Sequence, residues 1–116
     1  MVNYQWGIFW AELEPSRGSE QVGHRPVLVI SAEEVNQALP IVTILSITSV
    51  KPGRIVYPTE TFLEASITGL PKDSIAMAHQ IRAISKERIG EKCGSIEDEA
   101  LREKVKATIK MYLDIW

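Results

Sequence analysis

The sequence has little of what disulfide scaffolds and metal centres require. Cys93 is the only cysteine in 116 residues, so the chain cannot form an internal disulfide. The two histidines, His24 and His79, are far apart and have no metal-ligand spacing around them. We therefore expect no metal and no cofactor, and we interpret Cys93 as a small apolar filler.

Long apolar runs and an excess of positive charge are also missing. No apolar run approaches the roughly 18 residues of a membrane span, and the N-terminus does not resemble a signal peptide. We expect a cytoplasmic protein that has no membrane partner. The formal net charge is -2, so the chain as a whole lacks the basic surface typical of non-specific nucleic-acid binding. A local basic groove remains compatible with this charge.

The composition is that of a folded globular protein, with 45% hydrophobic and 24% charged residues. A chain of 116 residues leaves no room for a second core, so we expect a single domain over residues 1–116. Short apolar runs alternate with turn-forming residues, a pattern that indicates a small, strongly bent sheet or barrel. The predicted strands span residues 8–13, 26–31, 41–48, 54–58 and 74–82.

The end of the chain changes to a helical period. Apolar residues recur at steps of three to five over residues 96–116, which predicts an amphipathic helix. Ser95 is its predicted N-cap, and Asp98 completes a capping box. A shorter helical turn is expected to start at Ser85. Residues 15–23 include two glycines and few apolar groups, so we expect an exposed, mobile loop between the first two strands.

An arginine stands where this loop enters an apolar strand. Pro26 biases Arg25 toward extended backbone and restricts its motion. A guanidinium held in this way offers a planar fork of donors to phosphate oxygens. The alternative for Arg25 is a surface salt bridge.

Several segments together resemble the MazF/PemK family of bacterial toxin endoribonucleases. They are Ala-Glu-Leu-Glu-Pro at 11–15, Gly-Ser-Glu-Gln at 18–21, Arg-Pro-Val-Leu-Val at 25–29, Ile-Thr-Ser at 47–49, and Asp-Ser at 73–74 followed by Gln-Ile-Arg at 80–82. Their order and spacing extend over nearly the whole chain. The opening of the first strand and the connector at 51–69 match the family poorly.

The resemblance implies an α+β, mainly β fold: an SH3-like small β-barrel of the MazF/Kid/CcdB type with a C-terminal amphipathic helix. It implies a homodimer that cleaves single-stranded mRNA at specific sequences by 2′-OH attack and so inhibits translation. The products would carry 2′,3′-cyclic phosphate and 5′-OH ends. The implied partner is a cognate antitoxin with a disordered acidic segment, and any contact with DNA would be indirect, through that antitoxin.

The resemblance assigns catalysis to Arg25 and Thr48. When a ribose 2′-OH attacks the neighbouring phosphorus, negative charge grows on the non-bridging oxygens, and fixed donors stabilise it. The Thr48 hydroxyl adds a neutral donor to the guanidinium, although threonine is also common in strands for packing reasons. DNA has no 2′-OH, so the chemistry is restricted to RNA.

Proton transfer needs a further residue, because arginine has a pKa above about 12 and is a poor base. Glu20 on the predicted loop is one candidate base. His24 is another, since an unperturbed histidine has a pKa of about 6.5. A solvated loop position is the alternative for His24.

Candidate substrate-binding residues flank these positions. Ser19 and Gln21 share the predicted loop with Glu20, where a polar turn is the alternative, and Ser49 follows Thr48. His79 and Gln80 are expected in the same groove, reading base edges of splayed RNA, while polar packing in the sheet is equally open for His79.

Two other functions share this fold. A gyrase-binding branch of the same barrel ends in Trp-Gly-Ile, whereas this chain ends in Asp-Ile-Trp and retains Arg25 and Thr48. A catalytically silent RNA-binding relative is the third hypothesis. Cleavage of RNA separates the enzyme from both.

Overall fold

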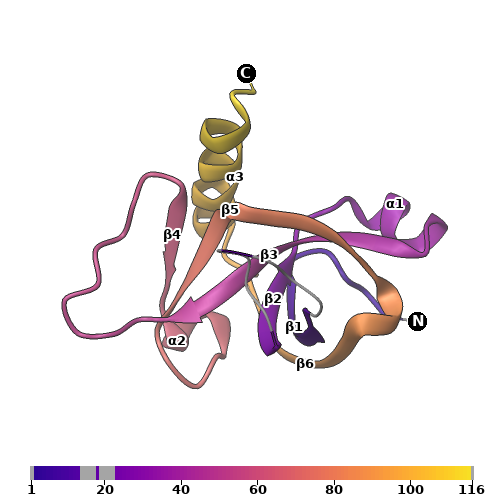
Figure 1. Ribbon diagram of the computed structural model, residues 1–116, viewed down its shortest axis with the longest axis horizontal. Helices are drawn as coiled ribbons and strands as arrows, with labels where there is room; N and C mark the ends of the chain where they lie inside the picture. Colours follow the sequence, from indigo (N-terminus) through magenta and orange to yellow (C-terminus); the bar gives the residue numbers. More distant parts are fainter. Residues whose placement is uncertain (1, 14–17, 19–22, 116) are drawn as a thin grey trace.

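A bent antiparallel sheet of six strands is the frame of the molecule (Figure 1). The computed structural model describes residues 2–13, 18 and 23–115. The strand order is β4-β5-β3-β2-β1-β6. The strands are β1 (Gly7–Glu12), β2 (His24–Val29), β3 (Ile41–Ser49), β4 (Glu60–Leu63), β5 (Ser74–Ser85) and β6 (Ile89–Ser95). Within the described residues β4 and β6 are edge strands, so the mainly β class is confirmed but the sheet is open rather than a closed barrel.

The helices are short except for the last. They are α1 (Glu33–Ala38), α2 (Ala65–Thr68), the 3-10 turn η1 (Lys86–Arg88) and α3 (Glu99–Leu113). The prediction of a C-terminal helix is confirmed, and α3 packs against β4 and β5 (Figure 1). Its N-cap is Asp98, whose Oδ2 accepts the Leu101 N–H at 2.9 Å. The predicted cap at Ser95 is wrong, because Ser95 is the last residue of β6.

The two faces of the sheet carry separate hydrophobic clusters. On β2, Leu28 belongs to the cluster that includes Leu101 and Val105 of α3. Its neighbours Val27 and Val29 belong to the other cluster. Side chains alternate between faces along a strand, so both faces of β2 are buried, as its unbroken apolar run predicts.

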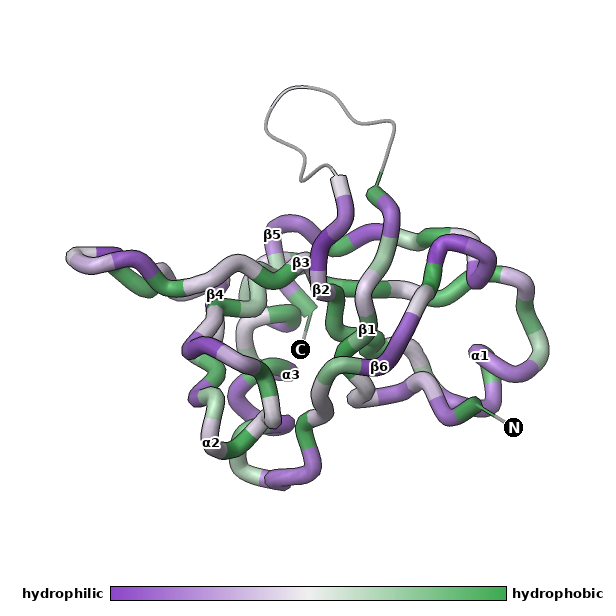
Figure 2. The backbone as a smooth tube through the Cα atoms, turned by 90° about the horizontal axis from the view of Figure 1, so that it is seen from below, coloured by the Kyte–Doolittle hydropathy of each residue, from purple (hydrophilic) through white to green (hydrophobic). Residues whose placement is uncertain are grey.

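The predicted strand at residues 54–58 is wrong. Those residues belong to an irregular connector between β3 and β4, which Figure 2 shows extending from one side of the molecule. The Arg54 N–H donates to the Lys51 carbonyl at 3.0 Å, and Gly53 has a φ of 79°, so a tight turn precedes Arg54. Pro58 follows, and neither a turn nor a proline favours a strand between them.

Strand β6 was not predicted, because its glycines interrupt any alternation of apolar residues. A Cβ at Gly94 would lie 2.7 Å from the Thr68 carbonyl oxygen, and one at Gly90 would lie 3.2 Å from the Trp10 carbonyl oxygen. The glycines therefore allow neighbouring backbones to approach closely. Ser85 behaves as predicted: its hydroxyl accepts the Glu87 N–H at 3.2 Å and caps η1.

Candidate active site

The register of β2 and β3 brings Arg25 and Thr48 together. The two strands pair antiparallel, and the last pair of the ladder joins Val27 to Ser46. If this register is extended by two residues, Arg25 lies opposite Thr48. Residues that lie opposite each other project on the same face of a sheet. The printed sequence separates these residues widely, so this juxtaposition is a product of the fold.

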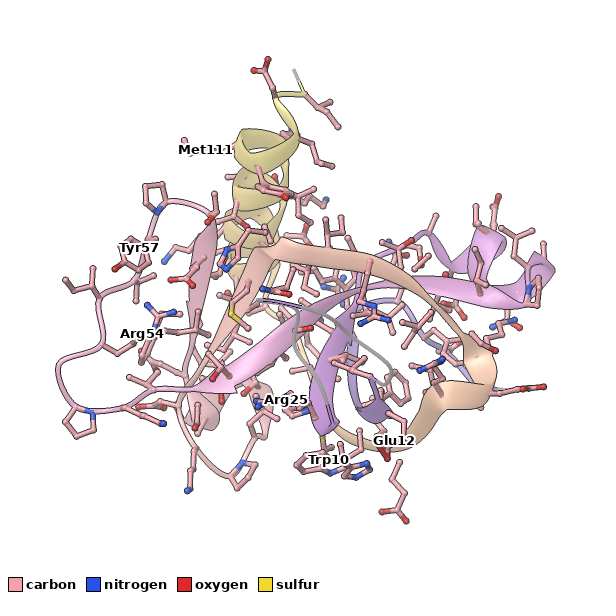
Figure 3. All side chains as sticks on the ribbon, in the orientation of Figure 1. Trp10, Glu12, Arg25, Arg54, Tyr57 and Met111 are labelled. Carbon is pink, nitrogen blue, oxygen red and sulfur yellow. The ribbon has the colours of Figure 1, made fainter. Side chains whose placement is uncertain are left out.

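A pocket of about 480 Å³ lies where the pairing of β2 and β3 stops. Its lining comprises Trp10 from β1; His24, Arg25 and Pro26 from β2; Ile47, Thr48 and Ser49 from β3; and Leu70, Pro71, Lys72 and Ser74 at the entry to β5. Figure 3 shows Arg25 and Trp10 at this end of the sheet. The volume is in the usual range for small-molecule or nucleotide-sized ligands.

The imidazole of His24 is held by two neighbours from β1. It stacks on Trp10 with ring centroids 5.0 Å apart and an interplanar angle of 7°. Its Nδ1 lies 3.7 Å from Glu12 Oε2. Because side chains alternate along a strand, His24 and Arg25 project from opposite faces of β2. Both line the pocket, so the pocket extends around the end of β2.

The opposite wall of the pocket is the turn before β5. Ser49 pairs with Ser74 in the register of β3 and β5, so the predicted residue Ser49 borders this wall. The Ser74 hydroxyl donates to the Lys72 carbonyl at 2.9 Å. Among the described residues that line the pocket, Arg25 and Lys72 carry positive charge and none carries negative charge.

The family assignment comes from a match over residues 4–113 to the family described as PemK-like, MazF-like toxin of type II toxin-antitoxin system. The chain belongs to this toxin family. Endoribonuclease MazF9 of Mycobacterium tuberculosis is 34% identical over 114 residues, covering 94% of this chain and 94% of the relative. Endoribonuclease EndoA of Bacillus subtilis is 33% identical over 113 residues, covering 97% and 96%.

Solved structures share the toxin fold. MazF (Form-I) from Deinococcus radiodurans superposes with a TM-score of 0.81 at 23% identity, over 99% of each chain. A MazE-MazF structure (Form-III) from the same organism gives 0.76 at 22% identity, over 100% of each chain. These likenesses extend over the open sheet and α3 together.

The predicted loop of this toxin, with Ser19, Glu20 and Gln21, lies outside the described residues. The chain on either side of it is described. The Leu13 N–H donates to the Gly23 carbonyl at 3.0 Å, so the segment leaves and rejoins the sheet at the Glu12–His24 end of the β1–β2 hairpin. That end adjoins the pocket.

His79 and Gln80 do not line the pocket formed by the described residues. They lie in β5 beyond the pair of Ser46 with Met77, where the register with β3 shifts before it resumes at the pair of Ile44 with Arg82. Sequence spacing alone does not reveal such an irregularity, because several residues of β5 are accommodated opposite one of β3.

His79 instead belongs to a cluster at the start of β4. Its Nδ1 lies 3.1 Å from Thr59 Oγ1, and its Nε2 lies 4.0 Å from Glu60 Oε2. The Glu60 carboxylate is buried and binds Arg54 Nη2 at 2.7 Å and the Tyr57 N–H at 3.0 Å. Burial alone raises the pKa of Glu60, but the hydrogen bonds from Arg54 and Tyr57 outweigh it and lower this pKa.

Trp10 and Lys72 are pocket residues that the sequence did not single out as a pair. One face of the Trp10 indole stacks on His24. Lys72 precedes the Asp73-Ser74 segment of the family resemblance, which is the signal that could have drawn attention to it.

Another hollow of about 470 Å³ lies between α2, β4 and α3. Its walls include Phe62, Ile67 and Leu101, and neither Arg25 nor Thr48 reaches it. Among the described residues no three His, Cys, Asp or Glu side chains are grouped to hold a metal ion. Burial raises the pKa of the Cys93 thiol, which favours its protonated, unreactive form.

Proposed function

We propose that this chain is a metal-independent endoribonuclease toxin that cleaves single-stranded mRNA at specific sequences and so inhibits translation. Relatives above 30% identity that match almost the whole chain are named endoribonucleases. The observation that carries the proposal is that Arg25 of β2 and Thr48 of β3 line one pocket. No helix in the described part of the chain is long and apolar enough to span a membrane.

In the proposed reaction, the ribose 2′-OH attacks the adjacent phosphorus and the bond to the 5′-oxygen breaks. The 2′-OH proton passes to a base, and the leaving oxygen takes up a proton to become a 5′-OH. The other product end is a 2′,3′-cyclic phosphate. Arg25 and Thr48 donate hydrogen bonds to the non-bridging oxygens, where negative charge grows, and so stabilise the transition state.

His24 and Glu20 remain the two candidates for proton transfer. The His24 imidazole lines the pocket, is exposed at its edge, and is oriented by Trp10 and Glu12. Orientation by two neighbours is what a general acid or base requires. Glu20 is outside the described residues, and its candidacy depends on the sequence alone.

The proposed partners are a second copy of this chain and a cognate antitoxin. Solved relatives include MazE-MazF assemblies. In this chain, large apolar side chains are exposed on the connector and at the end of α3. They are Ile55, Val56, Tyr57, Met111, Tyr112, Leu113 and Ile115. Figure 3 shows Tyr57 and Met111 on the same side of the molecule, and apolar surface of this kind is typical of protein interfaces. With mRNA as substrate and an antitoxin as partner, we propose that the protein acts in the cytoplasm.

The test is cleavage of end-labelled single-stranded RNA in the presence of EDTA. We expect products with cyclic phosphate and 5′-OH ends, and no cleavage by Arg25→Ala. If a diverse set of RNAs stays intact with the wild-type protein, the enzyme hypothesis is wrong. Stalled gyrase–DNA complexes would then favour the gyrase-binding alternative, and RNA binding without cleavage would favour the silent relative.

A further inference from the structure

Lys72 stands on the side of the pocket opposite Trp10 and His24. The pocket extends across four adjacent strands, from β1 through β2 and β3 to the start of β5. Neighbouring strands are about 4.8 Å apart, so three steps span about 14 Å. This distance is longer than one nucleotide, so an RNA strand whose reacting phosphate lies at Arg25 and Thr48 extends past them toward β5.

The backbone that carries Lys72 is fixed on both sides. Its carbonyl accepts the Ser74 hydroxyl at 2.9 Å. The next residue, Asp73, accepts the Val50 N–H with its carbonyl at 3.0 Å and the Ala65 N–H with Oδ1 at 2.8 Å. Pro71 precedes the lysine, and its ring restricts the φ angle of residue 71. The turn therefore holds the start of the Lys72 side chain in a defined place at the rim of the pocket.

The positive charge of Lys72 is not neutralised by a carboxylate within the described part of the protein. The carboxylate of its neighbour Asp73 is bound to the Ala65 N–H. Lys72 is exposed and forms no ion pair with any described residue. Other lysines of the described chain also lack an ion pair, but Lys72 is the described lysine that lines this pocket. An unpaired ammonium group at the rim of a pocket that already contains an arginine attracts a polyanion.

We propose that Lys72 binds the RNA phosphate next to the scissile one, on the β5 side of the pocket. This inference rests on the proposed function. An ammonium group is a point charge suited to a single phosphate, whereas the Arg25 fork suits the two oxygens of the reacting group. The flanking phosphate does not change charge during the reaction, so Lys72 stabilises the bound substrate and the transition state equally.

The first experiment measures binding of an RNA with a 2′-deoxy nucleotide at the cleavage site, which binds but is not cut. Lys72→Gln is compared with Lys106→Gln, a matched loss of one lysine on α3. We expect Lys72→Gln to weaken binding about fivefold at 0.1 M salt and to reduce the slope of log K against log salt by about 0.7. Lys72→Arg restores both values, and Lys106→Gln leaves both unchanged. A wild-type slope in Lys72→Gln overturns the inference.

The second experiment identifies the phosphate. A neutral methylphosphonate is placed at each linkage in turn. In the wild type, we expect a methylphosphonate at the linkage next to the scissile one, on the β5 side, to weaken RNA binding. In Lys72→Gln, the same methylphosphonate should not weaken binding further, because the lysine that contacts this phosphate is already absent. If the effect of Lys72→Gln on binding instead disappears when the methylphosphonate is at the scissile linkage, the assignment of Lys72 to the flanking phosphate is wrong.

Cleavage kinetics give an independent check. We expect Lys72→Gln to raise KM about fivefold with kcat unchanged. A reduced kcat with unchanged KM contradicts a binding role. If the wild type binds RNA but does not cleave it, the proposed function fails while the binding result for Lys72 still stands.

Discussion

Arg25 and Thr48 offer a phosphate two different kinds of donor, one charged and forked, the other neutral and single. Arg25→Lys keeps the charge and loses the planar fork. Thr48→Val keeps the shape and loses only the hydroxyl. We expect each change to lower the single-turnover cleavage rate about 10²-fold, because each removes a fixed donor to developing charge.

The control for these variants is Thr43→Val, the same isosteric change on β3 at a position that pairs with Ala83 away from the pocket. It should cleave at the wild-type rate, and thermal unfolding should show that all three variants are folded. Equal rates for Thr48→Val and Thr43→Val would remove the Thr48 hydroxyl from the mechanism.

His24 is the pocket residue whose role depends on its protonation state. A base must be neutral to accept the 2′-OH proton, so a histidine base makes cleavage rise with pH. We expect His24→Gln to lose this rise in the pH–rate profile. Trp10→Phe preserves an aromatic face beneath the imidazole, so this variant should retain the rise of the cleavage rate with pH. An unchanged profile in His24→Gln would leave Glu20 as the candidate.

At the scale of elements, the buried Glu60 carboxylate anchors the connector to β4. It binds Arg54 and the Tyr57 N–H, and these bonds lower its pKa below the ordinary value of 4.5. A lowered pKa in the folded state stabilises the protein above the unfolded pKa, and this contribution is lost as pH falls. We expect Glu60→Gln to reduce the free energy of unfolding by about 2 kcal/mol at pH 7.

The same variant should lose less stability than the wild type between pH 5 and pH 3, because the titrating group is gone. Urea unfolding followed by tryptophan fluorescence measures both effects. Glu64→Gln is the matched control, since Glu64 is exposed and its carboxylate contacts only the neighbouring Ser66 hydroxyl in the described structure. Parallel pH curves for the wild type and Glu60→Gln would contradict the anchoring role.

The sequence predicted the central strands well and the edges poorly, for a physical reason. β1, β2, β3 and β5 are apolar because they are buried, and their predicted starts lie within two residues of those observed. The edge strand β6 contains Gly90, Gly94 and charged residues, so it lacks the pattern. Helix α1 has no side-chain cap, and its Glu33 instead accepts the N–H groups of Tyr4 and Gln5.

Some residues that line the candidate pocket could be predicted from the sequence, but Trp10, Lys72 and the geometry of the pocket could not. Family resemblance indicated Arg25 and Thr48, but only the register of β2 and β3 shows why they meet. The register of β3 and β5 separates His79 from them, because Thr48 pairs with Ile75 and His79 lies four residues farther along β5. Long-range pairing is decided by the whole sheet, and local sequence does not encode it.

At the scale of the molecule, the candidate active-site pocket and the exposed apolar surface proposed for the dimer lie in different places. The pocket lies at the ends of β2 and β3, whereas the exposed apolar side chains of the connector and of the end of α3 do not line it. Figure 1 shows α1 on the side of the molecule opposite the connector. A change in the apolar surface can therefore be compared with a similar change on α1.

Met111 is 58% exposed, and a charge placed there would be desolvated in any interface that covers it. We expect the wild type to sediment as a dimer and Met111→Glu to raise the dimer dissociation constant at least tenfold. The control is Val35→Glu on α1, where the native side chain is 45% exposed. Sedimentation equilibrium over a range of concentrations measures the constant. A monomeric wild type, or equal weakening by both variants, would show that the end of α3 is not the dimer interface.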